Sequence, residues 1–317
     1  MRCYVLPKER CFDAQSNPVL IKSPIMTNIS RANRTRMFRD VEFLTGITPH
    51  RNHANLKSLE RAYRYIWTEL EAVGYSPEMQ TWRVRGHEYH NVIAKFRPEL
   101  ERRLVVGAHY DVCGTTPGAD DNASAVAGLL ETARVVAHIN PNLDFGIDFV
   151  AYSLEEPPHF GSESMGSYVH AQSLHEAGTN VVGMICYEMI GYFSDEPGSQ
   201  QYPHPELARR YPATGNFIVV VGIEEHKAFN EAIYQGMRQA GTIPTEVIHF
   251  PGPGGLASMS DHMNYWTFGF PALMINNTSF LRNPHYHEPT DTIDTLDFDR
   301  MAGVVDAHVH ALQGVAF

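Results

Sequence analysis

The sequence has little of what a disulfide scaffold, a membrane protein or a nucleic-acid-binding protein needs. Its four cysteines, Cys3, Cys11, Cys113 and Cys186, show no CxxC spacing, which argues against a disulfide framework and a structural zinc site. No apolar run approaches the length of a membrane span, and the N-terminus lacks the apolar segment of a secretory signal. A net charge of −11 without a long Lys/Arg run argues against nucleic acid as a partner.

These absences define the expected setting of the protein. We expect a reduced, cytoplasmic location, which a signal peptide missing from the given sequence would change to a secreted or periplasmic one. We expect neither a membrane nor a nucleic acid as a partner. The oligomeric state is left open by the sequence.

What is present is an alternation of short strands and helices. Apolar runs bounded by turn residues predict six strands, within NVIAKF, RLVVGAHY, IDFVAYSL, VVGMICYEMIG, NFIVVVG and PALMINN. Helical spacing predicts helices at about 56–70, 124–138, 164–176, 226–240 and 298–313. This alternation predicts a single α/β domain with three layers, α/β/α, and a mixed sheet that is parallel at its centre. Residues 1–50 are predicted to be an irregular extension packed on the domain of residues 51–317.

Two adjacent glutamates follow one of these predicted strands. The stretch AYSLEEPPHF places Glu155 and Glu156 where the strand ends and two prolines follow. Successive side chains in a strand point to opposite faces, so neighbouring carboxylates can serve two purposes in one cavity. A solvated turn is the alternative, because charged pairs beside proline are common in loops. Sites in α/β sheets gather beyond the carboxyl ends of the strands, which favours the cavity.

Other segments bring further metal-ligand types to the ends of predicted strands. His109 and Asp111 lie two residues apart, and Asp111 is placed to accept the second ring N–H of a metal-bound histidine. The remaining candidates are Asp120 and Asp121 at a predicted helix start, Glu188 after MICY, and His285, Tyr286 and His287 in a proline-bounded loop. One of the two aspartates can cap the helix. Two histidines and at least three carboxylates suit two zinc ions that share one carboxylate.

In this order, the segments AHYD, PGADDNASA, LEE, EMIG and YHEPTDT resemble the motifs of the dinuclear zinc aminopeptidase family. The wider family contains glutamate carboxypeptidase, the transferrin receptor and glutaminyl cyclase. The resemblance begins near residue 50 and continues to the C-terminus. It implies a zinc-exopeptidase-like fold and a zinc peptidase catalytic domain at residues 51–317.

The resemblance also implies a role for each candidate residue. The implied ligands of two Zn²⁺ ions are His109 at one site, His287 at the other, Asp121 as the bridge, and Glu156 and Glu188. Glu155 is then the general base. Tyr286 resembles a tyrosine that hydrogen-bonds the developing oxyanion, and an aromatic ring packed under the loop is the equal alternative. Asp111 supports His109. Glu188 stands where many members have Asp.

The activity that the resemblance implies is that of a zinc metallo-exopeptidase. It is an aminopeptidase that hydrolyses N-terminal residues from peptide or aminoacyl substrates through a metal-activated water. A glutaminyl-cyclase-like acyltransferase with a single zinc is the alternative. A non-catalytic binding protein, such as the transferrin receptor, is a third reading, but that class loses ligands that this chain keeps.

Further residues carry expectations about the substrate and the surroundings of the site. Tyr286, Phe280 and Phe160 predict an apolar or aromatic substrate pocket, and Arg282, the only nearby cation, is expected to face solvent. The segment after Glu156 is longer than the family's usual link, so we expect it to shape the substrate mouth. The triplet Ser260, Asp261 and His262 is interpreted first as a helix N-terminus.

Overall fold

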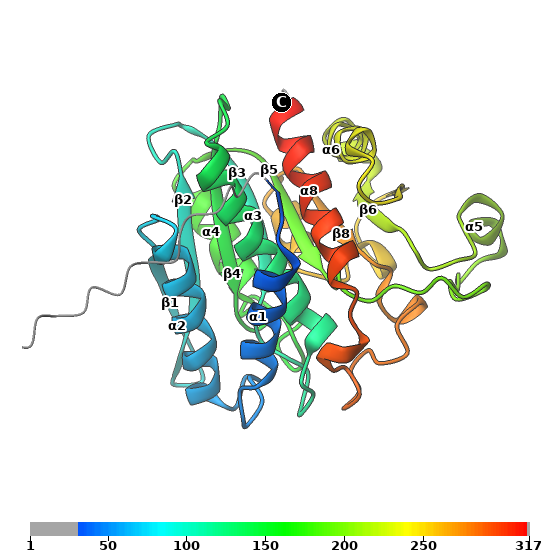
Figure 1. Cartoon of the computed structure of the whole chain (residues 1–317). Coiled ribbons are helices and arrows are strands. Elements are labelled where there is room, and N and C mark those ends of the chain that lie inside the picture. Colours follow the sequence, from blue (N-terminus) through cyan, green and yellow to red (C-terminus); the bar gives the residue numbers. More distant parts are fainter. Residues whose placement is uncertain (1–30, 316–317) are drawn as a thin grey trace, which may run out of the picture.

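The computed structural model describes residues 31–315 and arranges them around one eight-stranded sheet (Figure 1). The strands are β1 (Glu78–Val84), β2 (His87–Phe96), β3 (Arg102–His109), β4 (Gly146–Tyr152), β5 (Asn180–Glu188), β6 (Ile218–Ile223), β7 (Thr245–Phe250) and β8 (Ala272–Asn276). Their order across the sheet is β1-β2-β4-β3-β5-β8-β6-β7.

The sheet is mixed and parallel at its centre. Strand β3 pairs in parallel with both β4 and β5, β5 pairs in parallel with β8, and β6 does so with β7. The pairs β1/β2, β2/β4 and β6/β8 are antiparallel. Every residue of β4 is buried, as expected of a central strand that is covered on both faces.

Helices cover both faces of this sheet. The α-helices of the described residues are α1 (Arg34–Thr45), α2 (Leu56–Ala72), α3 (Ala125–Ile139), α4 (Gly166–Glu176), α5 (Pro205–Arg210), α6 (Lys227–Ala240), α7 (His262–Thr267) and α8 (Phe298–Gly314). The apolar cluster on one face combines sheet residues with α1, α2, α3, α6 and α8. The cluster on the other face combines them with α4 and α7. The predicted three-layer α/β/α domain is therefore confirmed.

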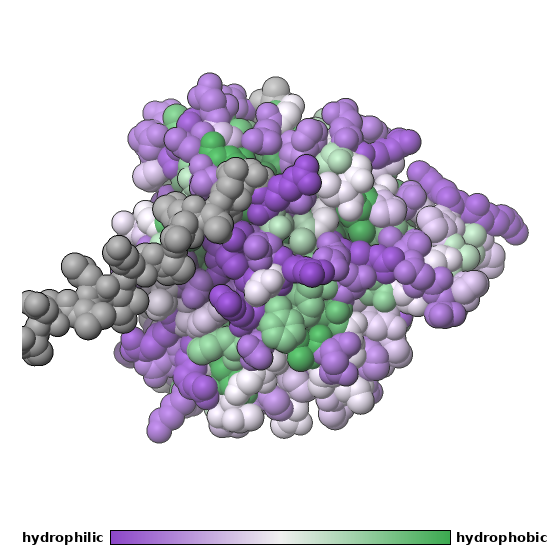
Figure 2. Space-filling model, in the orientation of Figure 1, coloured by the Kyte–Doolittle hydropathy of each residue, from purple (hydrophilic) through white to green (hydrophobic). Residues whose placement is uncertain are grey.

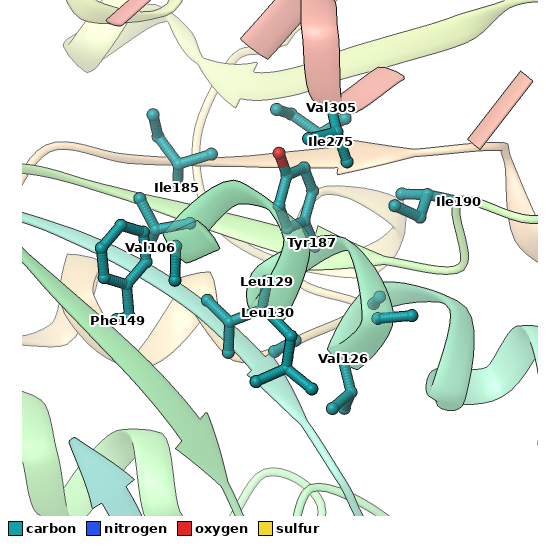
Figure 3. Close-up of a cluster of buried hydrophobic side chains, with 14 of the residues drawn as sticks. Val106, Val126, Leu129, Leu130, Phe149, Ile185, Tyr187, Ile190, Ile275 and Val305 are labelled. Atoms are coloured by element: carbon teal, nitrogen blue, oxygen red, sulfur yellow. The ribbon is translucent and has the colours of Figure 1, made fainter. Parts of the chain in front are cut away.

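The larger apolar cluster shows why α3 lies against the centre of the sheet. Its Val126, Leu129 and Leu130 recur at helical spacing and are buried against strand residues such as Val106 and Phe149 (Figure 3). The 3.6-residue period of the helix places these side chains on one face. Their burial fixes the position of α3 on the sheet, so that its N-terminus and the turn before it lie near the carboxyl end of β3.

Residues 34–45 are not irregular, contrary to the prediction for residues 1–50. They form α1, which Asn33 caps by accepting hydrogen bonds from the N–H groups of Thr35 and Arg36. Met37, Val41 and Leu44 of this helix belong to the main apolar cluster. The prediction failed because scattered polar residues hid a short apolar stripe. Residues 1–30 lie outside the described residues, and the division at residue 50 stays a prediction.

The other predicted helices and strands are present, with ends shifted by a few residues. Two strands were missed, β1 and β7, which are the outermost strands of the sheet. Strand β1 has no buried residue, so its sequence lacks the apolar run that marks a central strand. In residues 31–315, no helix combines the length and the apolar character needed to span a membrane.

The face formed by α1, α2, α3 and α8 is largely hydrophilic, with a limited hydrophobic area below its centre (Figure 2). On α1, Phe38 and Phe43 are exposed. Phe38 nevertheless packs against Phe298, and Phe43 stacks on Tyr65. These exposed rings therefore tie α1 to the neighbouring helices.

Candidate metal centre

The candidate ligands converge because they follow adjacent parallel strands. His109 is the last residue of β3, Glu188 is the last residue of β5, and Glu155 and Glu156 follow β4 by a few residues. Carboxyl ends of parallel strands lie at the same edge of a sheet. The turn at residues 119–124 brings Asp121 to this edge, and the loop after β8 brings His287.

A first group of donor atoms surrounds His109. Its Nε2 atom lies 3.5 Å from Asp121 Oδ1 and 3.3 Å from Glu188 Oε2. All three side chains are buried. A second group surrounds His287, whose Nε2 atom lies 3.1 Å from Asp121 Oδ2 and 3.3 Å from Glu156 Oε2. The two oxygens of Asp121 thus face different histidines, which is the geometry of a bridging carboxylate.

The spacing of these donors fits metal ions. Nitrogen and oxygen ligands about 2.0–2.1 Å from a tetrahedral zinc lie roughly 3.3–3.4 Å from each other, close to the separations found here. Both ring nitrogens of His109, Asp121 Oδ1 and Glu156 Oε1 are buried without a hydrogen-bond partner in the described structure. Buried polar atoms seldom lack a partner, and cations held between these groups would supply one.

The electrostatics of the site also favour bound cations. Burial raises the pKa of Glu155 well above its ordinary value, and burial with the nearby Asp121 carboxylate raises the pKa of Glu156 to about 8. Burial raises the pKa of Glu188 as well. Burial alone would lower the pKa of His109, but Glu155 and Glu188 raise it well above its usual value. Burial and neighbouring carboxylates thus disfavour the charged forms of these glutamates, and bound cations would offset that penalty.

Asp111 and Asp291 accept hydrogen bonds from the backbone N–H groups of candidate site residues. The two carboxylate oxygens of Asp111 accept hydrogen bonds from the N–H groups of Glu155 and Glu156, each over 3.2 Å. Asp111 Oδ1 lies 3.6 Å from His109 Nδ1, slightly beyond hydrogen-bond distance. Asp291 accepts from the N–H group of Asp121 over 3.0 Å. The sequence predicted the pairing of Asp111 with His109 and missed its contacts with the glutamates.

The two adjacent aspartates differ in what they contact. Asp120 accepts hydrogen bonds from the backbone of Gly191 and from the side-chain amides of Asn277 and Asn283. Its carboxylate therefore ties three loops together and does not face the ligand atoms. Asp121 keeps an unpartnered oxygen. Only Asp121 is thus free to bind a metal.

The N-terminus of α7 lies at Ser260, Asp261 and His262, as predicted, but neither Ser260 nor Asp261 caps it with its side chain. Asp261 makes no side-chain capping hydrogen bond, and the hydroxyl of Ser260 donates to Glu188 Oε2 over 2.6 Å. Asp261 is fully buried, and both of its carboxylate oxygens lack a hydrogen-bond partner among residues 31–315. The packing of α7 against β5 and α4 decides these contacts, and local sequence cannot show it.

Three residues beside or within the site have left-handed backbone conformations. Leu154, just before Glu155, has φ 66°, Met189, just after Glu188, has φ 47°, and His287 has φ 58°. Residues with side chains adopt such values rarely and at a small energetic penalty. The chain bends sharply at these points, and this directs the neighbouring side chains into the site.

An apolar pocket opens from the donor atoms, and its empty space is about 880 Å³ when the open solvent at its mouth is included. Its lining includes Asp121, Glu155, Glu188, Tyr286 and His287 at one end and Tyr202, Leu207, Tyr211, Phe217, Val219, Val221, Ile248, Phe250, Leu256, Met259, Met274 and Phe280 elsewhere. An apolar pocket with a few converging polar groups is typical of sites that bind small molecules or substrate side chains. The ring of Tyr286 stacks on His287 with centroids 3.8 Å apart, so Tyr286 lies both in the cavity and against a candidate ligand.

Three expectations about the surroundings of this cavity are wrong. Phe160 and the rest of the segment 157–170 do not line it; residues 202–211, around α5, form that wall. Arg282 does not face solvent but is buried, donates to the carbonyl of Phe217 and lies over the Phe217 ring. These contacts join distant segments, so neighbours in sequence gave no signal for them.

The fold and this constellation define a metallopeptidase-like protein, and the comparisons give the family. The model of Peptidase family M28 matches residues 91–312. The chain therefore belongs to peptidase family M28. This confirms the resemblance seen in the motifs and places the protein among peptidases, a family that in general depends on metal ions.

Two relatives show what the chain is similar to in sequence. The chain is 39% identical to "Uncharacterized protein YfbL" of Escherichia coli over 89% of this chain and 88% of that one. It is 28% identical to "Leucine aminopeptidase 1" of Arthroderma otae over 67% of this chain, and it spans about half of that protein, 54%.

Solved structures share the fold at lower identity. The Legionella pneumophila LapA aminopeptidase superposes with a TM-score of 0.71 at 18% identity, over 90% of this chain and 72% of that one. Bacteroides thetaiotaomicron glutaminyl cyclase gives 0.68 at 20% identity, over 90% of this chain and 99% of that one. Because aminopeptidases and cyclases share this architecture, the fold alone does not decide between them.

Proposed function

We propose that this protein is a zinc-dependent aminopeptidase with two metal sites. The observation that supports it most is the pair of donor groups that share Asp121, with unpartnered buried atoms in both. His109 and Glu188 would hold one ion, His287 and Glu156 the other, and Asp121 both. Two complete donor groups favour hydrolysis over the glutaminyl-cyclase-like alternative, which uses a single zinc.

The bound ions would supply Lewis-acid polarisation of the substrate carbonyl and a more acidic water. Glu155 Oε2 lies 3.7 Å from His109 Nε2 and lines the cavity, so its carboxylate is placed to take a proton from the attacking water. The same group would then return a proton to the leaving amine. Tyr286, at the same end of the cavity, would donate its hydroxyl to the developing oxyanion.

The cavity supports an uncharged N-terminal residue as the preferred substrate. Among residues 31–315, no Lys or Arg lines the cavity, so an acidic side chain would meet no cation of this part of the chain there and would be repelled by the carboxylates. The same carboxylates would attract the free ammonium group of the substrate. The apolar walls would receive an aliphatic or aromatic side chain.

Metal content and two glutamine variants test whether Glu155 acts as the base while Glu156 binds metal. Elemental analysis is expected to find about two zinc ions per chain, as in other two-metal sites. Glu155→Gln keeps the size of the side chain and removes the base, so kcat should fall by about 10²–10⁴-fold with zinc content unchanged. Glu156→Gln should instead lose zinc from one site. Identical behaviour of the two variants would contradict these roles.

A substrate panel separates the aminopeptidase from the cyclase. We expect Leu- and Phe-amides to be hydrolysed with higher kcat/KM than Glu-amide, and N-acetylated versions to be resistant. Equal hydrolysis of the acetylated set would exclude an aminopeptidase. One zinc per chain under excess metal, together with cyclisation of N-terminal Gln peptides, would support the acyltransferase instead.

A further inference from the structure

The thiol of Cys113 lies beside the second donor group. Its Sγ atom, one oxygen of Glu156 and one ring nitrogen of His287 all lie within 4.8 Å of one another. Cys113 follows Asp111 in the loop after β3 and is half buried, whereas Cys186 is fully buried. The loop therefore presents a sulfur atom to the same small volume that Glu156 and His287 share.

The buried carboxylate of Glu156 also calls for a ligand beside Cys113. Only 3% of Glu156 is exposed, and its Oε1 atom is buried without a hydrogen-bond partner in the described structure. A buried carboxylate oxygen left without a partner is destabilising by about 1–3 kcal/mol or more. A cation bound among Glu156, His287 and the thiol would remove that penalty.

The distances allow sulfur to join the site after a small adjustment. Around a tetrahedral zinc, sulfur at about 2.3 Å and nitrogen or oxygen at about 2.0–2.1 Å lie roughly 3.6 Å apart. The nitrogen and oxygen atoms already have such spacing, since His287 Nε2 lies 3.1 Å from Asp121 Oδ2 and 3.3 Å from Glu156 Oε2. From within 4.8 Å, the sulfur needs to approach by at most about 1.2 Å to reach the spacing expected for zinc. A rotation about one side-chain bond covers such a distance.

We propose that Cys113 is a further ligand of the ion in the second site, beside Asp121, Glu156 and His287. This inference rests on the proposed two-metal function. Ligation forms a bond from Sγ to the cation and releases the thiol proton to solvent. The first site would keep only nitrogen and oxygen donors, so the two sites would differ in metal preference. Thiolate ligands favour zinc and other soft ions over magnesium or manganese, and the second site would retain zinc more strongly.

Cobalt substitution tests this ligand by spectroscopy. In the full chain loaded with two Co²⁺ ions, a thiolate ligand gives a sulfur-to-cobalt charge-transfer band in the near ultraviolet. We expect this band in the wild type, its loss in Cys113→Ser, and its retention in Cys186→Ala, which removes a thiol from outside the donor group. Zinc competition with a chelator should show a site at least about tenfold weaker in Cys113→Ser, because even the loss of a residue that only orients a metal ligand usually costs 10–100-fold.

Alkylation followed by mass spectrometry gives a second readout on the unmodified protein. Zinc should slow the reaction of Cys113 with iodoacetamide, and the peptides that carry Cys3 and Cys11 serve as internal comparisons. A wild-type protein that binds two cobalt ions without the band would overturn the Cys113 proposal and leave the two-metal function standing. A band that persists in Cys113→Ser would also overturn it. A protein that binds no cobalt would overturn both.

Discussion

Replacing Asp111 with asparagine tests whether this residue holds the two adjacent glutamates in place. Asp111 is fully buried, and its two oxygens accept the N–H groups of Glu155 and Glu156 over 3.2 Å each. Asparagine keeps the shape but turns one oxygen into an amide group, so one N–H group faces another donor whichever way the amide is turned. A buried N–H group without an acceptor costs about 1–3 kcal/mol, and the other bond loses its charge assistance, about 1 kcal/mol more.

The expected result is a loss of roughly 2–4 kcal/mol in unfolding free energy. It is measured by urea denaturation of the zinc-loaded protein, because bound cations offset the repulsion that removing a carboxylate would otherwise relieve. Zinc affinity should fall by about 10–100-fold, as for other residues that orient metal ligands. An Asp111→Asn protein as stable as the wild type, with unchanged zinc affinity, would refute the argument that Asp111 positions these glutamates.

Two further predictions concern stability away from the ligands. Arg134 is buried, and its guanidinium lies 2.6 Å from Asp40. Arg134→Ala is expected to lower the free energy of unfolding by about 3–5 kcal/mol, because it leaves a buried carboxylate without its cation. Arg64→Ala, which breaks an exposed pair with Glu60, should change the stability little, because water screens such pairs, and equal losses in urea denaturation would contradict the role of burial. Burial lowers the pKa of His308 from 6.5 to about 3, so the stability that neutral His308 contributes is present above pH 6.5 and is lost as the pH falls toward 3. Between pH 6 and 5 the wild type should therefore lose about 1 kcal/mol more than His308→Gln, and identical pH profiles would exclude this histidine as a cause.

Local patterns in the sequence were sufficient for much of the fold. The central strands are short apolar runs, and α3 carries its apolar residues at helical spacing, because burial on both faces or on one face leaves a direct imprint on the sequence. The outer strand β1 buries none of its residues and left no such imprint. Helix α1 was missed because its stripe is short and lies among polar residues.

Residue type and order in the sequence also determined the candidate donors. Histidines and carboxylates stood at the ends of predicted strands, and parallel pairing in one sheet carries such ends to one edge. The fold brings His109, Asp121 and Glu188 together, and likewise His287 with Asp121 and Glu156. Their roles as metal ligands, and those of Glu155 and Tyr286, stay predictions that the experiments above address.

Only the tertiary structure decided what surrounds these donors. In it, the hydroxyl of Ser260 donates to Glu188, and the two oxygens of Asp111 accept from the N–H groups of Glu155 and Glu156. Residues 202–211 form a wall of the cavity. The tertiary structure also placed Cys113 beside Glu156 and His287. Each of these contacts joins segments far apart in the chain. Their distances depend on how helices and loops pack on the sheet, whereas a sequence pattern records only whether each residue is buried and in which kind of element.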